Sequence, residues 1–156
     1  MNNKGFTLPE ILVVTTVIVV FVVVSIILLR PANLTNDFYD AQRRTDIAEL
    51  ARALQRYKKD IGKFPVDIPV NVIGIGSSQY TYNLCPAIVP TYLSDLPFDP
   101  HSGLKAKGDE QTETTEPCNA QDVSHVTGYS IVRNPDSSLT LSAPGAVGPK
   151  IEIIVR

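Results

Sequence analysis

The stretch that decides the fold covers residues 4–29 and reads KGFTLPEILVVTTVIVVFVVVSIILL. Its apolar part, residues 11–29, is 19 residues long and carries no charge. As a helix rising about 1.5 Å per residue, this part would extend about 28 Å, close to the thickness of the hydrocarbon core of a bilayer. We therefore predict a membrane-spanning helix over residues 6–30.

The end of this segment differs from the end of an ordinary secretory signal. Signal peptides have apolar regions of about 7–15 residues, followed by small residues at the cleavage site. Here the apolar run is followed by Arg30 and Pro31, which offer no such site. We expect no cleavage behind the helix.

Glu10 stands at the start of the apolar segment. A carboxylate there costs up to a few kcal/mol unless it reaches the interface or meets a positive partner. The side chain could simply extend to the interface. Alternatively, cleavage between Gly5 and Phe6 would create an ammonium group on Phe6, four residues earlier on the same helix, and supply the positive partner.

Residues 4–10, KGFTLPE, resemble position for position the processing motif of type IV prepilins and type II secretion pseudopilins. The resemblance implies a leader, residues 1–5, that prepilin peptidase removes by cutting between Gly5 and Phe6. It also implies N-methylation of Phe6, and a role for Glu10 in neutralising the Phe6 amine of a neighbouring subunit during filament assembly. Pro9 matches common variation in this motif, and proline is tolerated in the first turn of a helix.

A second, amphipathic helix is predicted over residues 36–61. Pro31 should kink or end the first helix, and Thr35 or Asn36 can cap the second. Apolar residues recur at spacings of three and four, which indicates one buried face. These residues are Ile47, Leu50, Leu54, Tyr57 and Ile61. We expect the charged residues of the helix to form a solvated surface with weak ion pairs such as Asp40 with Arg44. They are Asp40, Arg43, Arg44, Glu49, Arg52 and Lys59.

The remainder of the chain indicates strands and loops. From residue 66 onward, short apolar segments alternate with Pro, Gly, Ser and Asn. Residues 128–133 and 139–142 flank a five-residue turn and predict an antiparallel hairpin, and residues 151–155 predict a third strand. The predicted fold class is α+β: a long N-terminal helix, first apolar and then amphipathic, packed on a small antiparallel sheet. The head comprises residues 31–156.

Two later segments strengthen the family resemblance. Residues 57–65, YKKDIGKFP, resemble the helix end of pseudopilins and related pilins. Residues 92–100, YLSDLPFDP, resemble the segment of the same proteins that leads from the loop after the helix into the sheet. The resemblance thus implies a type IV pilin-like head.

Cys85 and Cys118 lie in loop-like sequence on the part of the chain that would face an oxidising compartment. We predict a disulfide between them, and closing a loop of about 34 residues would stabilise the head by roughly 3–4 kcal/mol. Reduced structural cysteines are one alternative. A zinc site that adds His101 and His125 is another, although the ligands lack the close spacing of known zinc motifs.

Calcium is the one cofactor that the resemblance raises, because some type II secretion pseudopilins bind it in a comparable loop. Such a site needs several oxygen ligands that converge from a loop. The candidates by composition are Asp95, Asp99, Asp109, Glu110 and Asp122. No EF-hand spacing is present, so we expect solvated acidic residues and no bound cofactor.

Enzymatic activity and nucleic-acid binding are not predicted. Both histidines lie in polar segments, and residues 74–76, GIG, lack the third glycine and the helix of a dinucleotide site. The formal net charge of −2 gives no basis for binding nucleic acid through bulk charge.

The resemblance implies a structural subunit of a type IV pilus or a type II secretion pseudopilus. The expected partners are identical or related subunits, the peptidase that also methylates, an inner-membrane assembly platform, and lipid before assembly. The expected location is the cytoplasmic membrane, as a single-pass protein, and then a periplasmic or extracellular filament. The alternative is an uncleaved, single-span protein whose outer domain is a sensor or ligand-binding module.

Overall fold

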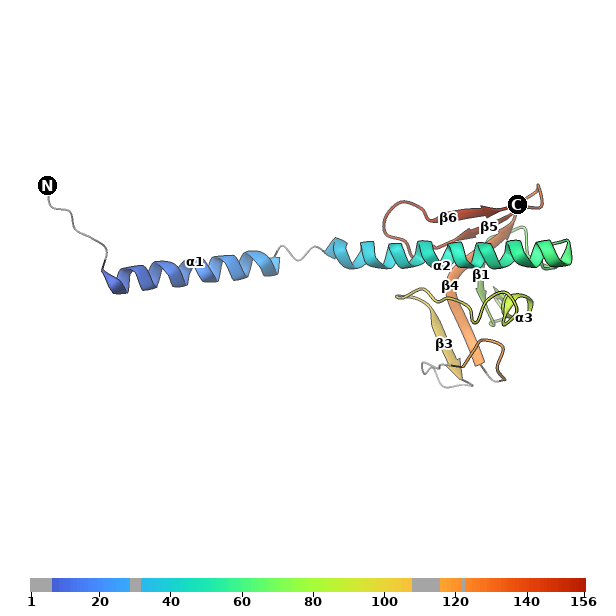
Figure 1. Ribbon diagram of the computed structural model, residues 1–156, viewed down its shortest axis with the longest axis horizontal. Helices are drawn as coiled ribbons and strands as arrows, with labels where there is room; N and C mark the ends of the chain where they lie inside the picture. The colour runs from blue at the N-terminus through green and yellow to red at the C-terminus, as the bar shows by residue number, and fades with distance from the viewer. Residues whose placement is uncertain (1–6, 29–31, 108–115, 122) are drawn as a thin grey trace. The chain divides into compact units, whose positions relative to one another are not determined.

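The computed structural model describes residues 7–28, 32–107, 116–121 and 123–156 (Figure 1). It is an α+β structure in which an N-terminal apolar helix is followed by a second helix and a mixed sheet. The chain divides into two units, Met1–Leu34 and Thr35–Arg156, which are described separately below.

Two long helices account for the first part of the chain. Helix α1 comprises Leu8–Leu28 and helix α2 comprises Ala32–Ile61, four residues earlier than the predicted start of the amphipathic helix. The predicted effect of Pro31 falls outside the described residues. At the other end of α2, Gly62 has a φ of +83° and its N–H donates to the Lys58 carbonyl at 2.8 Å. This left-handed glycine ends the helix at the predicted residue.

The head contains a six-stranded sheet and a short helix, α3 (Cys85–Ile88). The strands are β1 (Ile73–Gly76), β2 (Thr81–Tyr82), β3 (Leu104–Lys107), β4 (Val123–Arg133), β5 (Leu139–Ser142) and β6 (Glu152–Val155). Their order is β2-β1-β4-β5-β6, with β3 also paired to β4. The long strand β4 is therefore the centre of the sheet, since it pairs with β1, β3 and β5.

The predicted hairpin and third strand are confirmed. Strands β4 and β5 pair antiparallel with Ile131 opposite Leu141, and β6 continues the sheet with Ile153 opposite Leu141. The prediction of a purely antiparallel sheet is wrong, because β1 and β2 pair in parallel. Strand β2 is only two residues long, and its sequence carries no strand pattern that could have revealed this pairing.

The core lies between one face of the sheet and α2. Ile47, Leu50 and Leu54 of the helix are fully buried, as are Ile131 and Leu141 of the sheet. In this two-layer arrangement, the apolar stripe of a helix covers the apolar face of a sheet. Figure 1 shows α2 crossing the strands of the sheet.

Ile61 does not belong to this core, contrary to the prediction from its spacing. It is the last residue of α2 and is 52% exposed. The chain turns at Gly62, and Phe64 beyond the turn is buried in the core cluster instead. The three-and-four spacing therefore does not predict burial at Ile61, where the helix ends.

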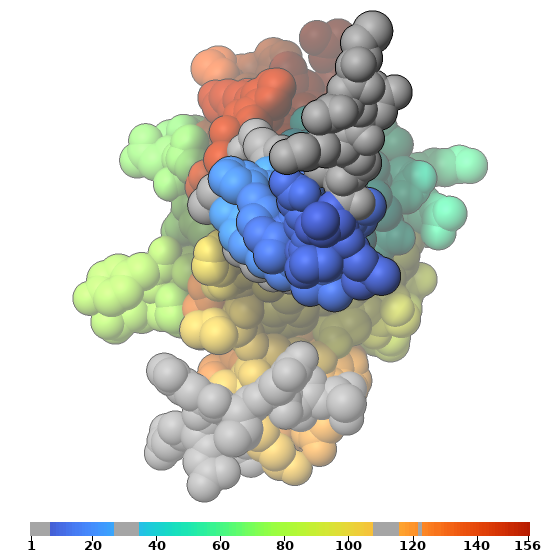
Figure 2. Space-filling model, turned by 90° about the vertical axis from the view of Figure 1, so that its left-hand side faces the viewer, coloured from blue at the N-terminus to red at the C-terminus, as the bar shows by residue number. Residues whose placement is uncertain are grey.

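The connection from α2 to β2 is the most exposed apolar part of the head. Val70, Val72 and Tyr80 all have more than two thirds of their surface exposed. In the space-filling view, the green segment that contains them projects from the head (Figure 2).

We expect Leu54→Ala to lower the free energy of unfolding by about 2–5 kcal/mol, because it leaves a cavity in the core. The measurement is urea unfolding of the full chain in detergent, followed by the near-ultraviolet circular dichroism of its tyrosines. Ile61→Ala is the control and should change the free energy by no more than about 0.5 kcal/mol. Equal losses in both variants would contradict this description of the core.

Candidate anchoring and assembly site

Helix α1 is long and apolar enough to cross a bilayer. Its candidate span, Leu8–Ile26, contains 19 residues, and none of them is buried within the described chain. The hydroxyls of Thr15, Thr16 and Ser25 donate to carbonyl oxygens four residues earlier, at 2.9, 2.7 and 2.7 Å. These polar groups are satisfied inside the helix, as the hydrocarbon region of a membrane requires.

Glu10 lies in the first turn of α1 and contacts Thr7. The backbone N–H and the hydroxyl of Thr7 each lie 3.4 Å from Glu10 Oε2, and the Glu10 N–H donates to the Thr7 carbonyl at 3.0 Å. The contact of the Thr7 N–H with the Glu10 carboxylate is one half of a capping box, while the Glu10 N–H donates to the Thr7 carbonyl and not to its hydroxyl. The positive end of the helix dipole also favours a carboxylate there. The Thr-x-x-Glu spacing is the usual sequence signature of such a contact, which the sequence prediction did not include.

Gly5 and Phe6 fall outside the described residues. Cleavage between them and methylation of Phe6 therefore stay predictions. Within the described residues, Glu10 contacts Thr7 in the first turn of its own helix, and this contact needs no second subunit.

The predicted disulfide between Cys85 and Cys118 is confirmed. The cysteines are 33 residues apart in sequence, their Cα atoms are 6.1 Å apart, and both side chains are buried. The alternative of reduced cysteines is therefore wrong in this structure. The zinc alternative is wrong as well, because both sulfur atoms are bonded to each other.

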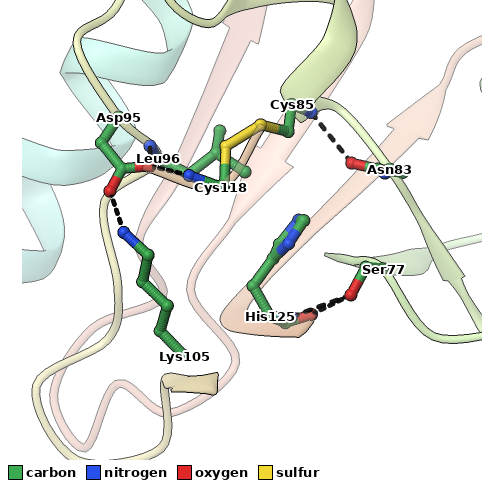
Figure 3. The surroundings of a disulfide bond; sticks show 8 residues. All are labelled: Ser77, Asn83, Cys85, Asp95, Leu96, Lys105, Cys118 and His125. Carbon is green, nitrogen blue, oxygen red and sulfur yellow. Dashed lines mark hydrogen bonds and ion pairs between the residues drawn. A yellow bond between two sulfur atoms is a disulfide. The ribbon is translucent and has the colours of Figure 1, made fainter. Parts of the chain in front are cut away.

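Asp95 fixes the surroundings of the disulfide (Figure 3). Its Oδ1 accepts hydrogen bonds from the N–H groups of Leu96 and Cys118, both at 2.8 Å. Its Oδ2 forms an ion pair with Lys105 on β3. Asp95 therefore connects the disulfide to the sheet and is not one of the solvated acids that the sequence predicted.

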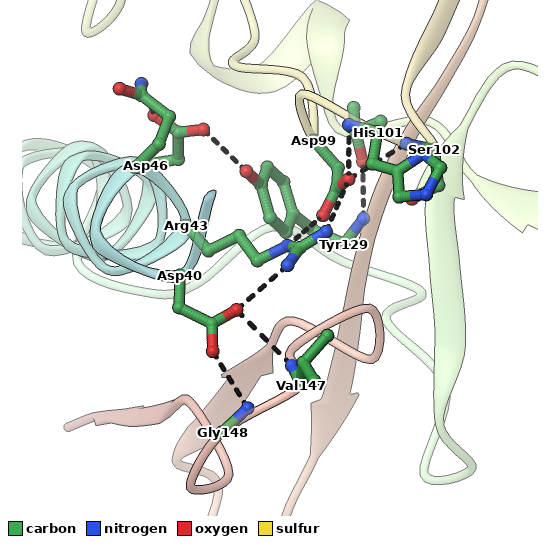
Figure 4. Close-up of polar contacts among 11 residues, drawn as sticks. Asp40, Arg43, Asp46, Asp99, His101, Ser102, Tyr129, Val147 and Gly148 are labelled. Atoms are coloured by element: carbon green, nitrogen blue, oxygen red, sulfur yellow. Dashed lines mark hydrogen bonds and ion pairs between the residues drawn. The ribbon is translucent and has the colours of Figure 1, made fainter. Parts of the chain in front are cut away.

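Arg43 is the centre of a buried ionic cluster, shown in Figure 4. It is 1% exposed. Its Nε and Nη2 donate to the two carboxylate oxygens of Asp99 at 2.5 and 3.0 Å, and its Nη1 donates to Asp40 at 2.8 Å. The predicted solvated surface is wrong for Asp40 and Arg43, and the ion pair within the helix joins Asp40 to Arg43 instead of Arg44.

The carboxylates of this cluster also bind backbone groups of two loops. Asp40 accepts the Gly148 N–H at 2.9 Å, and Asp99 accepts the N–H groups of His101 and Ser102, both at 2.9 Å. The cluster therefore joins α2 to the loop before β3 and to the loop between β5 and β6. These loops cover the flank of α2 that carries Asp40 and Arg43, which is why both are buried.

The pKa values follow from these contacts. Burial alone would raise the pKa of Asp99, but the hydrogen bonds from Arg43 and from the backbone outweigh burial and hold the pKa well below its usual range. The Gly148 N–H, and then Arg43, lower the pKa of Asp40. The hydrogen bonds to Asp99 raise the pKa of Arg43. All three groups are therefore charged at neutral pH.

A second polar contact joins α2 to the centre of the sheet. The Tyr129 hydroxyl donates to Asp46 Oδ2 at 2.5 Å, and Gln42 Nε2 donates to Asp46 Oδ1 at 2.8 Å. Burial raises the pKa of Asp46 in spite of these donors. Burial, and then the nearby carboxylate, raise the pKa of Tyr129.

His125 on β4 is buried without a hydrogen-bond partner. Its side chain is 2% exposed, and neither ring nitrogen has a partner among the described residues. It lies opposite Lys105 on β3, beside the disulfide (Figure 3). Burial lowers its pKa and Lys105 lowers it further, while Asp95 opposes them. The buried imidazole is therefore neutral at neutral pH.

The other predicted site residues do not form one metal site. His101 packs on Tyr39, with ring centroids 6.1 Å apart, and Asp95 and Asp99 are occupied by donors of the chain itself. Three further calcium candidates, Asp109, Glu110 and Asp122, lie outside the described residues. Within the described residues, no group of three or more His, Cys, Asp or Glu side chains is arranged to hold a metal ion.

Comparison of the chain with protein-family models, with curated proteins and with solved structures gave no match. The site must therefore be interpreted from its own residues.

Arg43→Met should lower the free energy of unfolding by about 3–5 kcal/mol, because it leaves two carboxylates buried without their counterion. Urea unfolding of the full chain in detergent measures the loss. Arg44→Met makes the same change at the adjacent, exposed position and should alter the free energy by at most about 0.5 kcal/mol. If the two variants lose equal stability, Arg43 does not hold the cluster together.

His125 should make the head less stable as the pH falls from 7 to 5. The unfolded chain binds a proton near the usual histidine pKa of about 6.5, whereas the folded chain binds it only at lower pH, so stability is lost on acidification. The slope is at most about 1.4 kcal/mol per pH unit. Unfolding measured across this range should show a smaller slope for His125→Leu than for the wild type.

The control for this pH dependence is His101→Leu, which removes the exposed histidine and keeps the buried one. It should keep the loss of stability on acidification that His125 causes. A His125→Leu variant with the wild-type slope would show that another group causes the acid sensitivity.

Proposed function

We propose that this protein is a structural subunit of a type IV pilus or a type II secretion pseudopilus, processed at its N-terminus and assembled through its apolar helix. The observation that carries the proposal is the N-terminal junction, in which Gly5, Phe6 and Glu10 occupy the positions of the prepilin processing motif, directly before an apolar helix. The α+β head with a long helix across a small sheet is compatible with this class.

The surface of α1 supports a role in assembly. The helix is apolar on all sides, since its described side chains from Leu8 to Ile26 are exposed valines, isoleucines, leucines and a phenylalanine, interrupted by a few polar groups. Such a helix needs a cover on every side. Lipid provides it before assembly, and the apolar helices of neighbouring subunits provide it in a filament.

The chemistry at Glu10 supports a role in the axial register. The contacts with Thr7 hold the carboxylate at the N-terminal end of α1. After cleavage, the ammonium group of a neighbouring Phe6 would enter the same apolar surroundings, where the low dielectric constant strengthens the attraction between opposite charges. An incoming subunit would then be most stable at the axial position that pairs these two charges.

The ionic cluster of Arg43 supports a role for the head as a rigid unit. It joins the first half of α2 to two loops, so the helix cannot separate from the sheet without exposing buried charges. A subunit that is moved through its N-terminal helix needs such a connection to transmit the movement to its head.

The test is intact-mass and N-terminal peptide analysis of the protein from membranes and sheared filaments of its native host. We expect a chain that starts at N-methylated Phe6.

Glu10→Gln should be processed in the same way, because glutamine also serves in a capping box and only the charge is lost. Loss of a charged hydrogen bond of about 1.5–3 kcal/mol should lower the filament yield roughly ten- to a hundredfold.

Thr7→Val is the matched control, because it removes the hydroxyl that contacts the Glu10 carboxylate and keeps the charge of Glu10. Its filament yield should stay near that of the wild type. Normal assembly of Glu10→Gln would refute the charge pairing and leave only the capping role. An intact Met1 start, in cells that process their other prepilins, would refute the filament proposal in favour of an anchored sensor or binding module.

A further inference from the structure

Three aromatic rings lie together on the head, near the start of α2, with Phe38 and His101 exposed and Tyr39 half-buried between them. Phe38 is 66% exposed, and its ring centroid lies 6.2 Å from that of Tyr39 in an edge-to-face arrangement. The Tyr39 ring in turn lies 6.1 Å from the ring of His101, which is also exposed. We call these three residues the aromatic cluster.

The buried ionic cluster holds two of these rings in place. The guanidinium carbon of Arg43 lies 6.0 Å from the centroid of Tyr39. Asp99, which pairs with Arg43, accepts the His101 N–H at 2.9 Å and so fixes the turn that carries His101. Rings that are fixed in this way lose little conformational entropy when they bind a surface.

The chain keeps the aromatic cluster close to the end of the candidate membrane span. That span ends at Ile26, so Phe38 follows it by 38 − 26 = 12 residues. Even if fully extended at about 3.4 Å per residue, 12 residues reach only about 40 Å. If α1 crosses a bilayer, the cluster therefore always stays within that distance of the membrane surface.

We propose that the aromatic cluster docks the unassembled head onto the headgroup region of the bilayer in which α1 is anchored. Aromatic rings with a polar edge or hydroxyl favour this region, because one part of the ring is apolar and another binds water. The proposal rests on the membrane anchoring in the proposed function and not on processing or assembly.

The size of the cluster favours a lipid surface over a second copy of the chain. A stable interface between proteins uses about 20–30 residues on each side, far more than three rings. A tethered patch needs only weak intrinsic affinity, because the short connection gives it a high effective concentration at the membrane.

The experiment uses the full, uncleaved chain in phosphatidylcholine nanodiscs that contain a phospholipid with a photoactivatable diazirine at its headgroup. After illumination, peptide mass spectrometry locates the lipid adducts. We expect adducts at the end of α1 and also on peptides that contain residues 35–43 and 99–104. Phe38→Ser should lower the adduct yield on the head at least fivefold and leave the adducts on α1 unchanged.

Tyr80→Ser is the matched control, because Tyr80 is an aromatic residue of the same head that is 79% exposed. It should leave every adduct at the wild-type yield. The near-ultraviolet circular dichroism of both variants checks that the head stays folded.

Three outcomes would overturn the proposal. Adducts on α1 without adducts on the head would refute docking and leave the anchoring and the filament proposal intact. Adducts on the head that Phe38→Ser does not reduce would show that another surface contacts the lipid. An absence of adducts on α1 as well would refute the anchoring together with the docking.

Discussion

The head depends on the burial of one arginine between two carboxylates. Arg43 binds Asp99 and Asp40, and these carboxylates in turn bind backbone groups of two loops that are far apart in sequence. Buried charges are costly unless every one of them is paired and hydrogen-bonded, so the cluster is stable only when the helix and both loops are in place together. It therefore makes the folding of α2 and of the loops one cooperative event, whereas apolar contacts alone tolerate slippage.

Helices α1 and α2 differ in how their charged side chains are paired. In α2, the charged side chains of Asp40 and Arg43 are buried and paired within the head. In α1, Glu10 carries the only charge of the described helix, and its partners are the groups of Thr7 in the same turn. That carboxylate is exposed and retains unused acceptor capacity. The charges of the Arg43 cluster are therefore paired within the head, whereas the Glu10 carboxylate can still accept further hydrogen bonds.

Local patterns predicted the elements of this fold better than its long-range contacts. The apolar run and the three-and-four spacing located both helices, and the two apolar segments that flank the five-residue turn at residues 134–138 located the central hairpin. The same spacing, extended backwards from Ile47, reaches Arg43 and Asp40, but a charged side chain on that face is normally solvated. Its burial depends on Asp99, 56 residues away, and no local pattern reports such a distant partner. Strand β2 and the partnerless His125 were missed for the same reason, since both depend on their neighbours in space.

The disulfide has a topological consequence for the lifetime of the head. The bond from Cys85 to Cys118 closes a ring of chain that contains Asp95, Asp99 and strand β3. A protease that cuts once inside this ring produces two fragments that stay covalently joined, with the residues that surround Arg43 still attached. Damage of this kind cannot release a piece of the head unless the disulfide is also reduced. Release of a fragment therefore needs two chemical events, the hydrolysis of a peptide bond and the reduction of the bond between the two sulfur atoms.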